Sequence, residues 1–281
     1  MIRHFASPYL AGETIDEMAK TVAAVNAEGF MSAVSILGEF VTQREESQTA
    51  VEEYKQVLAA INERKLDSNI HIKVTHMGLN LDKEFCYENV RELLTHAQEL
   101  GNFIRLDMED SPSVDGTLDL YERLRQDFDN VGVVIQSMMR RSLADVRRLA
   151  QMKANVRMVK GIYVEPRALA YTDREIIRNN YVVLLEELLS AGSYVGIATH
   201  DERLVWEGMR VAGRLGLEPS QYEFQMLLGV DAPLRRIIRD AGHRLRVAIP
   251  FGRNWYPYSL RRLRKNPTIA GYVFKAMFKR D

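Results

Sequence analysis

The chain of 281 residues is 46% hydrophobic, which is enough to bury the core of one large domain. Its 38 lysines and arginines balance 38 aspartates and glutamates, so the overall charge does not favour nucleic acid as a partner. The single cysteine, Cys86, excludes an internal disulfide framework and fits a reducing compartment. The sequence contains no signal-peptide pattern and no apolar run that could span a bilayer, so we expect a cytoplasmic protein.

Short apolar runs alternate with longer amphipathic stretches along the chain. The apolar runs predict eight strands, at Met31–Leu37, Ile70–Thr75, Phe103–Leu106, Gly132–Ile135, Arg157–Val159, Tyr194–Ala198, Glu223–Met226 and Leu245–Ile249. The amphipathic stretches predict helices at Ser47–Arg64, Asp82–Leu100, Gly116–Phe128, Ser142–Met152, Arg174–Ala191, Glu202–Leu215 and Ala232–Ala241. We also expect a leading helix over Glu13–Glu28, closing the bottom of a barrel, and a last helix beginning near Trp255.

Strands that alternate with helices of this length imply right-handed βαβ units and a parallel sheet. Eight such units in a chain of this size favour a closed (β/α)8 barrel over an open doubly wound sheet. No G-x-G-x-x-G motif follows the first strand, which weakens the open dinucleotide-binding fold further. We therefore predict that residues 1–281 form a single TIM-like barrel, with a short helix before the first strand and another after the last.

Polar residues follow each predicted strand where it ends. They are Gly38-Glu39, Lys73–His76, Asp107–Asp110, Gln136-Ser137, Lys160–Tyr163, Thr199–Asp201, Gln225 and the pair Arg261-Arg262 after the last strand. In a barrel of this kind the carboxyl ends of the strands form one rim, and that rim holds the active site. The pattern therefore favours an enzyme over a structural or interaction module.

Two of these groups suggest specific chemistry. Arg261 and Arg262 follow an aromatic helix start, and guanidinium groups bind carboxylates bidentately, so the pair suits a small anionic substrate with an apolar ring. Adjacent arginines can also be simply solvated. His200 within Thr-His-Asp could mark a metal-dependent hydrolase, but no second histidine lies at ligand spacing, and we expect no metal site.

An ordered series of motifs between Leu37 and Pro267 resembles the proline dehydrogenase family. The motifs are LGE (37–39), IKVTHMGL (72–79), RLDMEDS (105–111), VVIQS (133–137), RMVKGIY (157–163), ATHD (198–201), YEFQMLLG (222–229) and WYPYSLRRL (255–263). The resemblance implies a distorted (β/α)8 barrel that holds FAD. It also implies oxidation of L-proline to 1-pyrroline-5-carboxylate by hydride transfer to the flavin, the first step of proline catabolism.

The resemblance also assigns site residues. It makes Asp107 and Arg157 catalytic, and it implies substrate contacts from Lys73, Tyr163, Leu227, Arg261 and Arg262. The FAD contacts it implies are Met108, Gln136, Arg157, Lys160, Gly161, Ile162, Thr199, His200 and Gln225. Because cations surround Asp107, we expect it to stay ionised and to act by electrostatics and positioning rather than as a general base. The bland alternative is that an acid of the DMED stretch caps the next helix, for which Glu109 and Asp110 are better placed.

Two positions depart from the family pattern. Lys265 stands three residues after the paired arginines, where the family usually carries an acidic residue, so an ion pair on the solvent side of that helix would be altered. Ala248 stands where the family carries a tyrosine, two residues before Pro250, beside the C4 edge of the substrate, so a dehydrogenase that tolerates 4-hydroxyproline is an alternative. The tail Thr268–Arg280 mixes aromatic and basic residues and suits a helix packed on the barrel. The alternative is peripheral contact with a membrane surface, where a quinone would be the electron acceptor that reoxidises the flavin. A barrel that kept the fold without catalysis is the alternative from another functional class.

Overall fold

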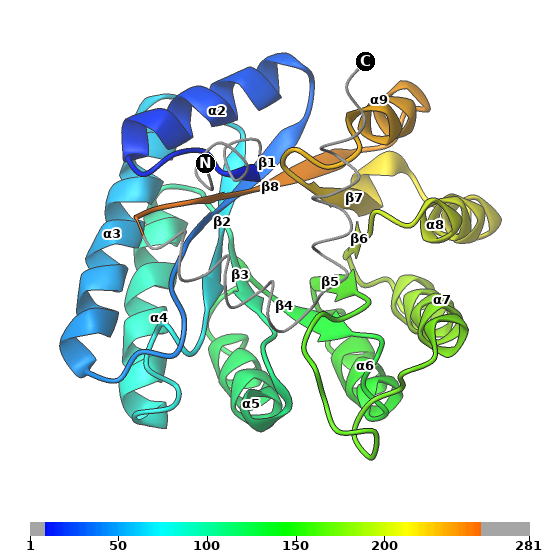
Figure 1. Ribbon diagram of the computed structural model, residues 1–281, viewed down its shortest axis with the longest axis horizontal. Helices are drawn as coiled ribbons and strands as arrows, with labels where there is room; N and C mark the ends of the chain where they lie inside the picture. The colour runs from blue at the N-terminus through cyan, green and yellow to red at the C-terminus, as the bar shows by residue number, and fades with distance from the viewer. Residues whose placement is uncertain (1–8, 254–281) are drawn as a thin grey trace, which may run out of the picture.

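Eight parallel strands close into a barrel in chain order (Figure 1). The computed structural model describes residues 9–253. Within this range the strands are β1 (Met31–Ile36), β2 (Ser68–Lys73), β3 (Ile104–Asp107), β4 (Val131–Gln136), β5 (Val156–Val159), β6 (Val195–Ala198), β7 (Tyr222–Leu227) and β8 (Leu245–Phe251). All eight predicted strands are present, and the predicted (β/α)8 barrel is confirmed.

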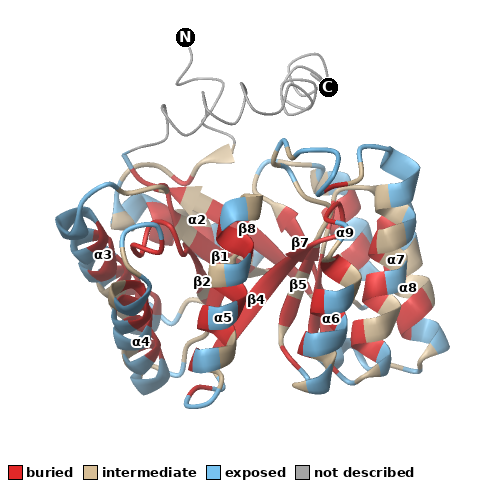
Figure 2. Ribbon diagram, turned by 90° about the horizontal axis from the view of Figure 1, so that it is seen from below, coloured by how far each residue is buried: buried red, intermediate tan, exposed pale blue. Residues whose placement is uncertain are grey.

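Helices surround the barrel on its outer side (Figure 1). They are α2 (Ile15–Ala27), α3 (Arg44–Glu63), α4 (Lys83–Glu99), α5 (Val114–Leu124), α6 (Ser142–Gln151), α7 (Arg174–Ser190), α8 (Glu202–Arg214) and α9 (Ala232–Asp240), with short 3-10 turns at η2 (Ser111–Ser113) and η3 (Pro219–Gln221). Each helix turns a buried face toward the strands and an exposed face toward solvent (Figure 2). The predicted last helix near Trp255 lies outside the described residues. No helix within residues 9–253 is long and apolar enough to cross a bilayer.

Helix starts follow from capping side chains that the sequence carries. The carboxylate of Asp82 accepts hydrogen bonds from the backbone N–H groups of Glu84 and Phe85 at the start of α4. Asp173 caps α7 in the same way. Such caps satisfy backbone donors that have no partner within the helix, and each stabilises its helix by about 1 kcal/mol.

The leading helix α2 has a different place from the one we expected. It packs against β1, β8 and α3 in the outer ring, rather than across the bottom of the barrel (Figure 1). A capping box between Thr14 and Glu17 starts the helix, and its buried residues include Met18 and Val22. These apolar side chains cover the outer surface where the first and last strands meet, because that surface would otherwise face water.

The second strand ends earlier than its apolar pattern suggested. We expected it to continue to Thr75, but β2 ends at Lys73. The chain then turns, because the backbone N–H groups of His76 and Met77 both donate to the carbonyl of Lys73. Thr75 therefore lies in a turn at the mouth of the barrel, where its hydroxyl is available to neighbouring loops.

The interior of the barrel is unusually polar for a core. Large hydrophilic side chains fill it where small residues leave room: a Cβ atom added to Gly132 on β4 would lie 2.3 Å from Nη1 of Arg105. A Cβ atom on Gly196 of β6 would lie 2.6 Å from Nε2 of Gln225. Because protein interiors are close-packed, glycine on one strand makes space for a long side chain from another. The barrel interior can therefore hold charge directly beneath the rim.

Candidate active site

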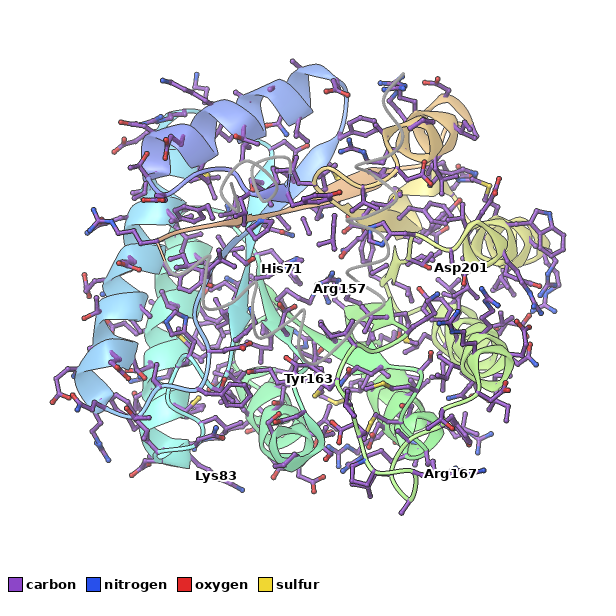
Figure 3. The ribbon with its side chains drawn as sticks, viewed as in Figure 1. His71, Lys83, Arg157, Tyr163, Arg167 and Asp201 are labelled. Atoms are coloured by element: carbon purple, nitrogen blue, oxygen red, sulfur yellow. The ribbon has the colours of Figure 1, made fainter. Side chains whose placement is uncertain are left out.

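Asp107, Arg157 and His71 form a contiguous group inside the barrel. Nη1 of Arg157 on β5 donates to Oδ1 of Asp107 at the end of β3, at 3.2 Å. The same nitrogen lies 3.3 Å from Nδ1 of His71 on β2. Figure 3 shows His71 and Arg157 close to the middle of the barrel. The two residues expected to be catalytic are thus in direct contact, although they lie 50 positions apart in the chain.

His71 is a buried imidazole among cations. Its burial lowers its pKa well below the usual value of 6.5, and the positive charges of Arg157, Arg105, Arg246 and Lys73 lower it further. The imidazole is therefore neutral at physiological pH. The sequence motifs did not indicate His71 as a site residue, although it precedes Lys73 by two positions on β2 and so points to the same side of the strand.

A second cluster links the loops that follow β2 and β3 to the end of β4. The carboxylate of Glu109 accepts hydrogen bonds from the backbone N–H of Thr75 at 3.0 Å and from the Thr75 hydroxyl at 2.5 Å. Nε2 of Gln136 donates to the backbone carbonyl of Glu109 at 2.8 Å. Burial raises the pKa of Glu109 to about 7, against the opposing effects of Thr75 and Lys73. Glu109 therefore joins neighbouring segments. The alternative that Glu109 caps the following helix is not what the structure shows.

The loop after β5 carries four of the residues expected at the cofactor or the substrate. Nζ of Lys160 donates to Oδ2 of Asp201 at 2.8 Å. Gly161 has a φ of +107°, a conformation that side-chain-bearing residues rarely adopt. Ile162 is exposed, whereas Tyr163 packs against a small apolar cluster that includes Met138. Figure 3 shows Tyr163 apart from His71 and Arg157, on the β4 side of the mouth.

The ends of β6 and β7 bring together the remaining predicted cofactor residues. The backbone N–H of Thr199 donates to the carbonyl of Gln225 at 3.1 Å. The backbone N–H of Leu227 donates to Nε2 of His200 at 2.9 Å, so that nitrogen carries no proton. Burial lowers the pKa of His200 to about 4, and Arg157 and Lys160 lower it further. His200 is therefore a neutral acceptor that joins the two strand ends.

The other expected residues have simple placements. Lys73 is buried at the end of β2, in register with Asp107, and Met108 is buried directly after β3. Ala248 lies on β8, paired in register with Ala33 and Leu227. Arg261 and Arg262 lie outside the described residues. Within the described part of the chain, no group of three or more His, Cys, Asp or Glu side chains has a metal-binding arrangement.

Asp201 is not among the residues expected to contact cofactor or substrate, but it binds one of them. Its Oδ2 accepts from Lys160 and also from Nε of Arg178 on α7, both at 2.8 Å. Burial alone would raise the pKa of Asp201, but the two cations lower it overall. Figure 3 places Asp201 beside β6, away from the central pair. Asp201 belongs to the Thr-His-Asp motif, which is the sequence signal that could have indicated it. Its contact with Arg178 on α7 could not be predicted from the sequence.

Comparisons with known proteins assign the family. A family model described as proline dehydrogenase matches residues 18–273. The proline dehydrogenase of Deinococcus radiodurans is 34% identical over 281 aligned residues, covering 98% of this chain and 91% of that protein. Proline dehydrogenase 1 of Bacillus subtilis is 32% identical, with the same two coverages of 98% and 91%. The chain belongs to the proline dehydrogenase family.

Solved structures share the fold of this proline dehydrogenase family member. Proline utilization A of Bdellovibrio bacteriovorus, in a form inactivated by N-propargylglycine, superposes with a TM-score of 0.87 at 23% identity over 94% of this chain. The protein of the same name from Corynebacterium freiburgense superposes with a TM-score of 0.81 at 22% identity over 98% of this chain. The present chain spans 32% of the length of each of these two chains.

Proposed function

We propose that this protein is an FAD-dependent proline dehydrogenase that oxidises L-proline to 1-pyrroline-5-carboxylate, the first step of proline catabolism. Membership of the family along nearly the whole chain carries the proposal. Bound FAD would supply the acceptor for the hydride that leaves the carbon next to the proline nitrogen. The residues of this chain would bind and orient the two partners.

The mouth of the barrel fits a flavin. Nε of Arg157 and Oε1 of Gln225 are buried and have no hydrogen-bond partner within residues 9–253. Buried polar atoms of this kind are costly unless a ligand or another group satisfies them. Both residues belong to the set expected around the cofactor. A planar, hydrogen-bonding ring beside a buried guanidinium would meet these unsatisfied atoms.

In this proposal the residues divide between cofactor and substrate. Arg157 stabilises negative charge on the flavin ring, because a fixed cation in a dry site acts more strongly than one in water. Gln136, Lys160, Gly161, Thr199 and Gln225 hold the rest of the cofactor, with Met108, Ile162 and His200. Lys73, Arg261 and Arg262 bind the proline carboxylate, and Tyr163 and Leu227 line the space around its ring.

Asp107 has a positioning role in this scheme. Its carboxylate accepts from Arg157, so it is already engaged with a cation at the centre of the site. We therefore expect it to orient Arg157 and to stabilise positive charge on the substrate nitrogen, rather than to remove a proton. A quinone as the final electron acceptor, a cytoplasmic location and peripheral membrane contact rest on the sequence alone; the tail at residues 268–280 lies outside the described range.

Anaerobic addition of L-proline to the purified protein tests the function. We expect a yellow protein whose flavin absorbance is lost when proline is added, with 1-pyrroline-5-carboxylate formed in equal amount to the reduced flavin. Proline amide, which lacks the carboxylate, is the control and should reduce the flavin far more slowly. A colourless protein that binds no added FAD would favour the non-catalytic barrel instead, and activity that requires stoichiometric metal would favour a hydrolase.

A further inference from the structure

His71 lies beneath the rim and has no role in the scheme above. It is 3% exposed and lies on β2, two residues before Lys73. Its Nδ1 atom is 3.3 Å from Nη1 of Arg157 and 4.0 Å from Oδ1 of Asp107. It therefore contacts the pair at the centre of the site from below, on the side away from the rim.

The contact has only one chemically consistent direction. A guanidinium group donates hydrogen bonds and accepts none, so Nδ1 of His71 must be the acceptor and must carry no proton. The imidazole proton then lies on Nε2, which is buried without a partner among the described residues. Four cations face this ring: Arg105, Arg157, Arg246 and Lys73. They oppose a second proton on the ring, so the acceptor at Nδ1 is permanent at physiological pH.

The two contacts account for both hydrogens on one nitrogen of Arg157. Nη1 carries two hydrogens, of which one is directed to Asp107 and the other to His71. The remaining donors of the guanidinium, on Nε and Nη2, are then turned away from these two residues. Nε is buried and has no partner within residues 9–253. The guanidinium group is thus fixed through Nη1, and its donors on Nε and Nη2 are left for a ligand.

We propose that His71 is a positioning residue, whose unprotonated Nδ1 fixes the orientation of Arg157 so that its free donors face the cofactor. The direction of those donors rests on the proposed function, whereas the His71–Arg157 hydrogen bond does not. An apolar side chain of similar size could fill the same volume. It could not accept from Nη1, so one hydrogen of that nitrogen would lack a partner and Asp107 alone would hold this end of the guanidinium.

Two substitutions separate hydrogen bonding from packing. In His71→Asn the side-chain oxygen can take the place of Nδ1, whereas His71→Leu fills space without an acceptor. We expect the Leu variant to be reduced by proline about tenfold or more slowly, the size expected for one lost hydrogen bond to a charged group. Its affinity for proline should change little, and the midpoint potential of its flavin should fall. The Asn variant should stay within about threefold of wild type.

A third variant keeps the test usable if the His71→Leu protein does not fold. His71→Gln keeps a polar side chain but carries its amide near the position of Nε2, so it should behave like the Leu variant. If Asn, Gln and Leu all slow the reaction equally, His71 acts by shape alone and the proposal is wrong.

A double-mutant cycle tests the link to Arg157 directly. In an Arg157→Met background, His71→Leu should cause no further loss of rate or of flavin potential. The same cycle on the urea unfolding midpoint of the apoprotein needs neither cofactor nor substrate. There His71→Leu should lower the midpoint in the wild-type background and not in the Arg157→Met background. If proline fails to reduce the wild-type flavin, the proposed function fails while this cycle still judges His71; additive effects would overturn the His71 proposal.

Discussion

Ala248 is one of two residues at which the sequence resemblance predicts a departure from the family pattern. It lies on β8, 9% exposed, with Ala33 on one side and Leu227 on the other. Two of these three neighbouring positions, Ala33 and Ala248, carry only a methyl group, so the side chains fill little space here. The family resemblance assigns a tyrosine to this place, beside the C4 edge of the substrate. We therefore predict that this place has room for an additional hydroxyl group on the substrate.

Substrate discrimination should depend on this position. We expect Ala248→Tyr to raise kcat/KM for L-proline and to lower it for trans-4-hydroxyproline. One filling group in a small pocket is worth about 1–3 kcal/mol, so the ratio of the two values should change about tenfold or more. Steady-state kinetics with both substrates on both proteins measures it. An unchanged ratio would mean that a different side chain, such as Tyr163 or Met226, already fills the space.

At the residue scale, the sequence proposed candidate site residues but not the contacts between them. Asp107 and Arg157 were selected because they match the family, but nothing in the chain indicated that they touch. His71 was missed even though alternation along β2 places it on the same face as Lys73. Counting back by two from each rim residue would also have found Arg105 before Asp107 and Glu223 before Gln225. Alternation along the strands thus indicated these residues. A polar residue within an apolar run, however, resembles the end of a strand, so the sequence alone does not mark it as part of a site.

At the scale of elements, the seam between β7, β8 and β1 depends on a buried ion pair. Arg246 on β8 donates from Nε and Nη2 to Glu223 on β7, at 2.8 and 3.0 Å, and from Nη1 to the carbonyl of Ser32 on β1. Tyr194 and Gln225 also donate to the same carboxylate. Burial alone would raise the pKa of Glu223, but these partners lower it overall. One side chain thus links the first strand to the last two.

Breaking this pair should destabilise the whole barrel. Glu223→Gln leaves the charge of Arg246 buried and uncompensated, which costs about 3–5 kcal/mol of unfolding free energy. The matched control is Glu187→Gln, whose carboxylate faces Arg147 on the surface at 3.3 Å and should cost no more than about 1 kcal/mol. Urea unfolding of both variants measures the difference. Equal midpoints would show that the buried pair contributes little to closure of the barrel.

For α2, the sequence predicted the helix but not the surface against which it packs. The helix itself was predictable from Thr14 and Glu17 and from the spacing of its apolar residues. Its position was not, because a helix before the first strand can pack across the bottom or over the outer surface. The choice depends on which apolar surface remains uncovered once the barrel is closed, and that surface is formed by β1 and β8 from opposite ends of the described chain. The local pattern of apolar residues in α2 does not indicate that β1 and β8 pair.

At the scale of the whole molecule, the barrel interior combines buried cations with neutral groups. Arg105 is 2% exposed and donates to Asn155, and burial lowers its pKa to about 10. Together with Arg157, Arg246 and Lys73 it gives the described interior an excess of positive charge over the carboxylates of Asp107 and Glu223. Glu109, which faces Lys73 and has a pKa of about 7, adds only part of a negative charge. Such an interior favours an anionic group at the mouth, as a substrate carboxylate or a reduced flavin would be.

This charge distribution also predicts how stability depends on pH. Burial lowers the pKa of His76 to about 4, with Lys73 adding to the effect, and the pKa of His200 is likewise about 4. Between pH 6.5 and 4 the unfolded chain binds protons at these histidines while the folded chain does not, so unfolding free energy falls as pH falls. Each histidine should cost roughly 3 kcal/mol by pH 4, and His71 acts in the same direction.

Glu109 should oppose this trend. Because its folded pKa is raised to about 7, the folded chain holds a proton that the unfolded chain has released, and stability gained in this way is lost as pH rises from 4.5 to 7. Three histidines outweigh one carboxyl, so we expect the urea midpoint to decline from pH 6.5 to pH 4.5, above the range where paired carboxylates are protonated. In Glu109→Gln the opposing contribution is gone, and the decline should be steeper. A wild-type midpoint that stays level or rises on acidification over this range would mean that the buried histidines accept protons in the folded barrel.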